Sequence, residues 1–138
     1  MIKQRAIVAG HICLDITPDL SRVPEGHFQT LLQPGQMIQT GEFSLTGGGA
    51  VSNTGLALHR LGVPTRLMAK IGNDLYGEAL RDIFRRESPH LCENLIIDPG
   101  TPTGLTLILN PPGFDRTFLH FHGANDTFYA SDLPRAVL

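Results

Sequence analysis

Three consecutive glycines, 47–49, stand directly before the strongest helical pattern in the chain. Apolar residues recur at helical spacing over 50–61, and Gly62 and Pro64 follow as stop signals. A helix that begins at a glycine loop offers free N–H groups, and glycine lets a ligand approach the backbone. Asn53 adds a donor and an acceptor on the first turn. The pattern therefore predicts either a binding loop or a flexible turn with a tolerated asparagine.

Strand-like and helix-like segments alternate through the rest of the chain. This β-α-β-α-β order predicts an α/β fold with a parallel sheet and helices packed on it. Two further strand-like regions do not fit between the helices, so we expect them to form a separate, small antiparallel sheet. The expected strands cover 5–16, 65–71 and 95–97, the helices 50–61 and 75–86, a hairpin 103–110 with 116–122, and a solvated strand or hairpin 36–45; a helix begins near 132.

Asp15 lies near the end of the first expected strand, which is almost continuously apolar at its start, as a strand buried on both faces should be. Open α/β sheets bind ligands at the carboxyl ends of their strands. A carboxylate placed there can accept hydrogen bonds from the hydroxyls of a polyol. The alternative is an aspartate that only begins the turn before Pro18.

Several other side chains have metal-binding chemistry, but their spacing alone does not build a site. His120 and His122 would share one strand face, as would His11, Cys13 and Asp15. Because spacing places no third ligand beside the histidine pair, we expect ordinary strand histidines and no metal ligands. Cys13 is more plausibly a small residue on a pocket floor. The segment 72–77 is interpreted as a capped strand-to-helix turn, and Arg116 either meets an anionic group or solvates a strand end.

Charge and hydropathy exclude several classes of protein. The 138 residues carry a net charge of −2 with a pI near 6.3, which argues against a nucleic-acid-binding or membrane-surface protein. We find no signal peptide and no run of 18 apolar residues, so we expect a cytoplasmic protein without a membrane span. Two cysteines cannot form a disulfide scaffold. Neither the P-loop nor the dinucleotide-binding glycine motif is present.

In their order and spacing, these segments resemble the amino-terminal half of a ribokinase-type (PfkB family) carbohydrate kinase. Segment 9–15 resembles the family's first strand with its terminal aspartate, and 48–62 resembles its first signature. Segment 72–77 matches a G-x-D-x-x-G motif, while Thr103-Gly104 and 123–125 match the two ends of a family hairpin. The resemblance implies a ribokinase-like fold over the whole chain.

The resemblance also implies a function: ATP-dependent phosphorylation of a hydroxymethyl group on a sugar or nucleoside, with Mg²⁺. It assigns sugar contacts to Asp15, Gly48, Gly49 and Asn53. Segments of approximately 12–47 and 101–121 would form a lid that closes over the sugar and pairs with the lid of another subunit. We therefore expect a small-molecule partner, no nucleic acid or membrane partner, and a homodimer or larger oligomer formed through the lid or an exposed sheet edge.

Two differences from the ribokinase pattern concern the sugar. Cys13 stands where that pattern has an asparagine, and Ala50 stands where it has a lysine. Both changes remove polar contacts, which argues against ribose itself. Two other readings of function stay open: a nucleoside kinase of the same family, and a non-catalytic sugar-binding or oligomerisation module. An unrelated α/β domain with a glycine loop is the remaining alternative.

The family's second signature, a G-A-G-D segment in the carboxy-terminal half, does not occur in these 138 residues. In the family it supplies the catalytic base, the anion hole and most of the ATP site. We therefore expect residues 1–138 to be the substrate-binding part of an incomplete ribokinase-like domain. The chain alone should be inactive, with no catalytic base and no complete site for ATP or Mg²⁺.

Overall fold

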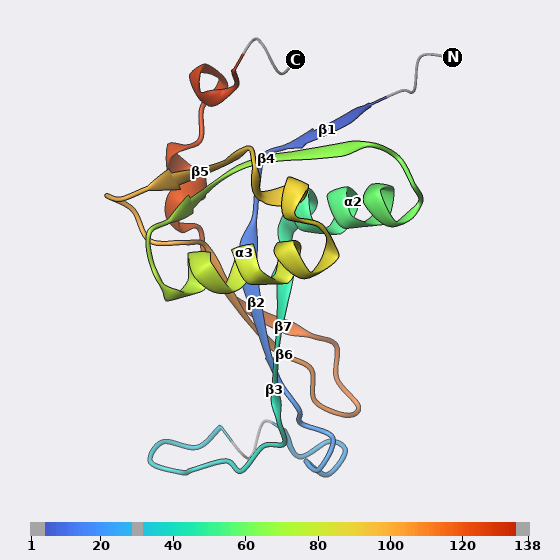
Figure 1. The fold of residues 1–138 in the computed structure, drawn as a ribbon. Helices are drawn as coiled ribbons and strands as arrows, with labels where there is room; N and C mark the ends of the chain where they lie inside the picture. The colour runs from blue at the N-terminus through green and yellow to red at the C-terminus, as the bar shows by residue number, and fades with distance from the viewer. Residues whose placement is uncertain (1–4, 29–31, 135–138) are drawn as a thin grey trace.

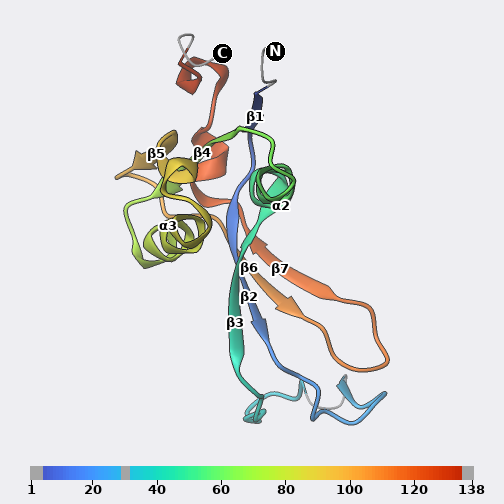
Figure 2. The same ribbon diagram turned by 45° about the vertical axis from the view of Figure 1, so that its right-hand side comes forward.

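A computed structural model describes residues 5–28 and 32–134 of the chain (Figure 1). Within these residues, seven strands and the α-helices α2 and α3 are arranged in two parts, which Figures 1 and 2 show from two directions. The strands are β1 Ala6–Ala9, β2 Cys13–Pro18, β3 Phe43–Gly48, β4 Thr65–Gly72, β5 Leu95–Asp98, β6 Leu105–Leu109 and β7 Thr117–Phe121; the helices are α2 Gly49–Arg60 and α3 Leu75–Glu87, with short 3-10 helices η1 Pro89–Cys92, η2 Gly123–Thr127 and η3 Ala130–Asp132.

The first part, here called the base, is a parallel sheet in the order β1-β4-β5 together with helices α2 and α3. The parallel pairing is expected because α2 precedes β4 and α3 connects β4 to β5. The predicted α/β fold is thus confirmed. Its core is formed by buried apolar side chains from both helices and from β2 and β4, among them Leu14, Val51, Leu67, Leu80 and Phe84.

The second part is a four-stranded sheet in the order β3-β2-β6-β7, here called the small sheet. Figures 1 and 2 show it extending away from the base. The pairs β2–β3 and β6–β7 are antiparallel, as predicted for this sheet and for the hairpin, but β2 and β6 run parallel. The sheet is therefore mixed, because its two halves come from separate hairpin-like segments that meet side by side. A small cluster of Leu20, Val23 and Phe28 packs with Leu109 beside it.

The opening segment is where the prediction of a single strand over 5–16 is wrong. The segment divides into β1, which belongs to the base, and β2, which belongs to the small sheet. Gly10 has a φ of 136°, a conformation that glycine tolerates and that interrupts the strand. Asn125 then holds the connection: its Oδ1 accepts from the Ile12 N–H at 2.9 Å, and its Nδ2 donates to the Ile12 carbonyl at 2.8 Å.

The expectation that the opening strand is buried on both faces is also wrong for β1, where Ala6 to Val8 are only half-buried. Within the described residues, β1 pairs with β4 alone and forms one edge of the base sheet. An edge strand lacks a neighbour on one side, so its apolar residues remain partly accessible.

The predicted ranges of both helices agree with the observed α2 and α3 to within one residue at either end. The α2 helix begins at Gly49 rather than Ala50, and α3 ends at Glu87 rather than Arg86. The weak strand expected over 36–45 is shifted, since β3 spans Phe43–Gly48 and residues 36–42 are not in a strand. Of the helix expected from 132, only the end of η3 falls at that point, and residues 135–138 lie outside the described part.

The turn at 72–77 has the structural role predicted for it. Asp74 caps α3, because its Oδ1 accepts from the Gly77 N–H at 2.8 Å. The same carboxylate also binds Thr103, which donates its N–H to Oδ2 at 2.8 Å and its hydroxyl to Oδ1 at 2.7 Å. Thr103 in turn accepts from the Gly72 N–H at 2.8 Å. The motif thus connects β4, α3 and the segment that leads into β6.

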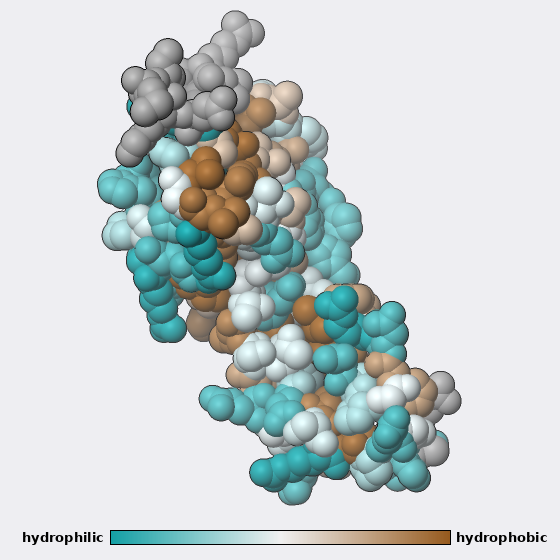
Figure 3. All heavy atoms as spheres, turned by 90° about the vertical axis from the view of Figure 1, so that its right-hand side faces the viewer, coloured by the Kyte–Doolittle hydropathy of each residue, from teal (hydrophilic) through white to brown (hydrophobic). Residues whose placement is uncertain are grey.

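Figure 3 shows the surface from the side, with the wider base above the narrower small sheet. Hydrophobic atoms gather in a patch on the base, among mostly hydrophilic neighbours. None of the helices in the described residues combines the length and the apolar character needed to cross a membrane.

Candidate functional site

A cavity of about 350 Å³ lies where β2, the start of α2 and the β6–β7 hairpin meet. Other cavities of comparable size occur, including one of about 330 Å³ between Arg5 and Glu93, so size does not identify the site. The chemistry of the lining identifies it instead, because this cavity combines a carboxylate, an amide, two imidazoles and one thiol. Its lining residues are His11, Cys13, Asp15, Gly49, Asn53, Thr106, Phe118 and His120.

The strand register explains how these residues come together. Asp15 pairs with Thr46 on β3 and with Thr106 on β6, and Thr106 pairs with His120 on β7. Because side chains alternate between the faces of a sheet, this row of four polar residues lies on one face across all four strands. Phe118 lies two residues from His120 and shares that face.

Asp15 is half-buried and is in close contact with Gly48. Its Oδ1 accepts a hydrogen bond from the Cys13 thiol, with 3.2 Å between sulfur and oxygen. A Cβ added at Gly48 would overlap both carboxylate oxygens of Asp15. Gly48 itself has a φ of −113°, which any residue can adopt, so the contact with Asp15 is what favours glycine there.

Gly49 makes a similar contact with His11. Its φ is +82°, in the left-handed region that favours glycine, and an added Cβ would lie 2.6 Å from the His11 Nδ1. The His11 carbonyl accepts from the Val51 N–H at 3.1 Å, which seats the first turn of α2 on the β1–β2 connection. Asn53, one turn further along α2, is exposed and lines the same cavity.

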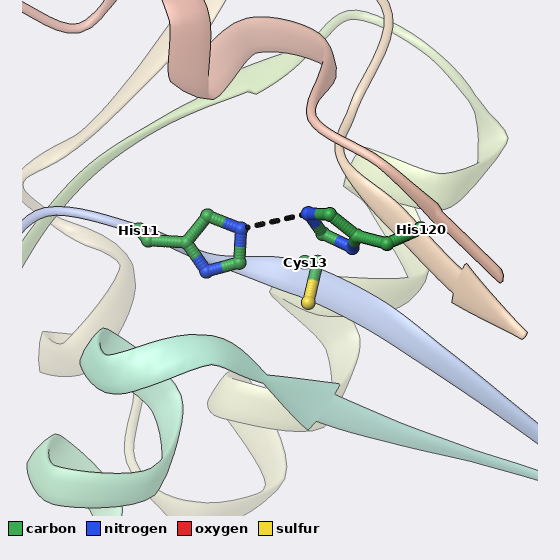
Figure 4. Close-up of side chains that lie close together, drawn as sticks. All are labelled: His11, Cys13 and His120. Atoms are coloured by element: carbon green, nitrogen blue, oxygen red, sulfur yellow. Dashed lines mark hydrogen bonds between the residues drawn. The ribbon is translucent and has the colours of Figure 1, made fainter. Parts of the chain in front are cut away.

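The lining of the cavity includes a hydrogen-bonded group of side chains, three of which are drawn in Figure 4. The Thr106 hydroxyl donates to the Cys13 sulfur at 3.3 Å and lies 2.9 Å from the His120 Nδ1. The Nε2 atoms of His11 and His120 are 3.2 Å apart. Burial raises the pKa of the Cys13 thiol to about 12, so the thiol is protonated at neutral pH.

His122 adds a third imidazole at the rim. Its ring centroid lies 4.8 Å from that of His120 and 6.0 Å from that of His11. Burial, together with the two neighbouring histidines, lowers the pKa of His11, which keeps its ring neutral at neutral pH. The His122 Nδ1 is 3.0 Å from the Asp126 carboxylate.

The structure brings the predicted residues to one place: Asp15, Gly49 and Asn53 line the cavity and Gly48 contacts Asp15. Sequence reasoning missed Thr106 and Phe118 and did not connect His11 with His120. The pairing of β2 with β6 would have shown these contacts, but that pairing is not local in sequence. The Arg116 guanidinium lies 5.5 Å from the Phe118 ring centroid, so it packs over a residue of the cavity.

The sequence also matches a known family of proteins. The model of the pfkB family of carbohydrate kinases matches residues 7–137. The chain belongs to that family. It is 24% identical over 112 residues to "Fructokinase-2" of Oryza sativa subsp. japonica, a match that covers 81% of this chain and 30% of the rice protein.

Solved structures show the same fold. A fructokinase of Xylella fastidiosa, solved with bound ATP, aligns with a TM-score of 0.72 at 20% identity over 99% of this chain and 39% of that one. The ribokinase of Giardia lamblia aligns with a TM-score of 0.72 at 21% identity over 93% of this chain and 39% of that one. The fold is therefore ribokinase-like. This pfkB family chain spans about a third of the rice relative and two fifths of these structures.

Proposed function

We propose that this chain forms the sugar-binding and lid part of an ATP-dependent carbohydrate kinase, which transfers phosphate to a hydroxymethyl group of its substrate. The observation that carries the proposal is that Asp15, Gly49 and Asn53, from two different elements, line a single cavity. Membership of the pfkB family and the bound ATP of the Xylella fastidiosa fructokinase support a kinase that uses ATP. We propose that Mg²⁺ accompanies the ATP.

The proposed division of roles follows from the chemistry of each group. The Asp15 carboxylate accepts hydrogen bonds from sugar hydroxyls, and the Asn53 amide both donates and accepts. Gly48 and Gly49 let the Asp15 and His11 side chains lie against the start of α2, and their backbone N–H groups are the proposed contacts to the sugar. Phe118 offers an apolar face to the carbon side of a sugar ring.

The small sheet is the proposed lid, which corresponds to segments of approximately 12–47 and 101–121. A lid over the sugar excludes water and so limits transfer of phosphate to water instead of the substrate. We assign no catalytic base within 1–138. The base, the anion hole and the ATP site are proposed to lie elsewhere in a longer protein, so this chain alone should not turn over.

Calorimetric titration of the chain with fructose, ribose and adenosine tests the proposal. We expect a sugar to bind, and Asp15→Ala and Asn53→Ala each to weaken that binding by about 1–3 kcal/mol, because a hydrogen-bonding partner in the site is lost. Asp82→Asn, a surface change on α3, is the matched control and should leave binding unchanged.

Three outcomes distinguish the sugar kinase from the alternative functions. Binding of adenosine with no binding of either sugar would support a nucleoside kinase. Sugar affinity that is unchanged in both alanine variants would contradict the site. The reading frame supplies the third: a downstream G-A-G-D segment supports the kinase, whereas a frame that encodes only about these 138 residues supports a non-catalytic binding or oligomerisation module.

A further inference from the structure

Two neighbouring side chains and a third that is distant in sequence bring metal-binding atoms together in the cavity. The ligand atoms of His11, Cys13 and His120 all lie within 4.8 Å of one another. His11 comes from the β1–β2 connection, Cys13 from β2 and His120 from β7, as Figure 4 shows. The fold thus supplies the third ligand that sequence spacing did not provide.

The separations suit a tetrahedral ion. Zn²⁺ binds imidazole nitrogen at about 2.0–2.1 Å and thiolate sulfur at about 2.3 Å, so tetrahedral angles place two nitrogens roughly 3.3 Å apart and a nitrogen and a sulfur roughly 3.6 Å apart. The two histidine Nε2 atoms are 3.2 Å apart already. Side-chain rotations within the 4.8 Å span of the group would direct all three ligand atoms to one ion.

The hydrogen bonds around Thr106 fix which ring nitrogen of His120 carries the proton. Since the Thr106 hydroxyl donates its one proton to the Cys13 sulfur, the 2.9 Å contact with His120 requires the Nδ1–H of His120 to donate to the Thr106 oxygen. The His120 Nε2 therefore carries a lone pair, which accepts a hydrogen bond from the His11 Nε2–H. A metal-binding histidine typically donates its other ring N–H in this way.

We propose that His11, Cys13 and His120 bind one transition-metal ion of the zinc class. Ions of this class bind imidazole and thiolate ligands, whereas Mg²⁺ and Ca²⁺ bind oxygen ligands. Two imidazoles and a thiolate therefore favour an ion of the zinc class. On binding, the Cys13 thiol proton passes to solvent and the His11 ring proton moves from Nε2 to Nδ1, so that both Nε2 atoms coordinate. Three protein ligands leave the fourth position to a water molecule.

The surroundings of the ion are partly acidic. The Asp15 carboxylate, which accepts from the Cys13 thiol before the proton is lost, would lie beside the ion without binding it, whereas His122 lies at the rim beside Asp126. All three ligands line the same cavity as Asp15 and Asn53, so the ion and a sugar would share it. The metal site does not depend on the proposed kinase function, since it rests on these side chains alone.

Titration of the reduced chain with Co²⁺ tests the proposal. We expect one Co²⁺ per chain, with the near-ultraviolet charge-transfer band of a cobalt–thiolate bond and the intense visible bands of tetrahedral cobalt, and we expect Zn²⁺ to remove both. Cys13→Ser should abolish the charge-transfer band. His120→Gln, at an exposed strand position, should weaken binding at least about tenfold, and Thr106→Val by roughly 10–100-fold through loss of the orienting contact.

Matched controls use the other cysteine and a histidine outside the cavity. Cys92→Ser and His90→Gln should bind Co²⁺ as the unchanged chain does, because neither residue lines the cavity. The thermal unfolding midpoint of each variant confirms folding, and His120→Gln remains informative if Cys13→Ser fails to fold. Absence of the thiolate band from the unchanged chain, or its loss in Cys92→Ser rather than in Cys13→Ser, would overturn the proposal.

Discussion

Gly48 and Asp15 show how a single hydrogen atom in place of a side chain shapes the site. The Asp15 carboxylate occupies the space that a Cβ at position 48 would fill. Because the backbone of Gly48 is not in the left-handed region, alanine there would strain no dihedral angle. Its effect would fall on the neighbouring carboxylate, which makes this position a selective probe of the site.

We predict that Gly48→Ala displaces the Asp15 carboxylate and weakens sugar binding by about 1–3 kcal/mol, the range for a lost hydrogen bond to a charged group. Calorimetric titration with the sugar that the unchanged chain binds measures the effect. Gly100→Ala is the control, because its added Cβ would meet only Asp98, at 3.4 Å. Equal sugar affinity for the Gly48 variant and the unchanged chain would show that Asp15 does not contact the sugar.

Much of the candidate site followed from the sequence, for a physical reason. The position of Asp15 at a strand end and that of Asn53 after a glycine loop are local patterns, and local patterns fix local backbone geometry. The meeting of His11 with His120 spans 109 residues and depends on the register of three strands. No local pattern encodes such a register, so these contacts required the structure.

At the scale of elements, Asp74 shows how one carboxylate joins separate parts of the fold. It caps α3 through Gly77 and binds both the N–H and the hydroxyl of Thr103, which leads into β6. Burial alone would raise the pKa of Asp74, but hydrogen bonds from Thr103, Gly77 and Tyr76 outweigh it, so the pKa is lowered. The charged form is therefore the one that stabilises the fold.

We predict that Asp74→Asn lowers the free energy of unfolding at pH 7 by about 1–3 kcal/mol, because an NH₂ group would face a donor and one acceptor would be lost. A carboxyl with a lowered folded-state pKa stabilises the fold above its unfolded pKa, here 3.8, and that stabilisation is lost as the pH falls through the folded value. The difference between the unchanged chain and the variant should therefore shrink below about pH 4.

Urea denaturation at pH 7 and pH 3 measures this difference, with Asp82→Asn as the surface control on the same helix. A difference that stays constant between the two pH values would show that the Asp74 charge does not contribute to the stability of the fold.

Elements such as α3 were predictable because apolar spacing and the Asp74 cap mark them locally. The break after β1 was not, since apolar residues typical of a strand continue on both sides of Gly10 and His11, and only the different pairings of β1 and β2 reveal it.

At the scale of the whole molecule, the face of the small sheet opposite the cavity is apolar. Ile16 pairs with Leu45 on β3 and with Leu107 on β6, and Leu107 pairs with Leu119 on β7. This row, here called the apolar row, crosses all four strands. Leu45 is 50% exposed and Leu119 is 57% exposed. Exposed apolar faces of this kind often mark interaction surfaces, which supports the proposed assembly through the lid.

We predict that the chain self-associates through the apolar row and that Leu45→Lys with Leu119→Lys shifts it to monomers, because buried lysines in an apolar interface would lack partners. Analytical ultracentrifugation over a range of concentrations measures the shift. Met37→Lys is the control, since Met37 is 92% exposed and lies outside the small sheet. If the double variant associates as strongly as the unchanged chain, the apolar row is not the interface, and the sheet edge at β1 is the alternative.

The division of the opening segment at Gly10 has a geometric consequence for how the molecule could close. Asn125 binds both the N–H and the carbonyl of Ile12, and Leu14, two residues further along, is buried in the core of the base. The inner end of β2 is therefore fixed to the base, and Asp15 is the next residue. Pro18 lies three residues beyond Asp15, or roughly 10 Å along an extended strand. A bend in β2 beyond Asp15 would thus move the outer end of the small sheet without displacing the carboxylate.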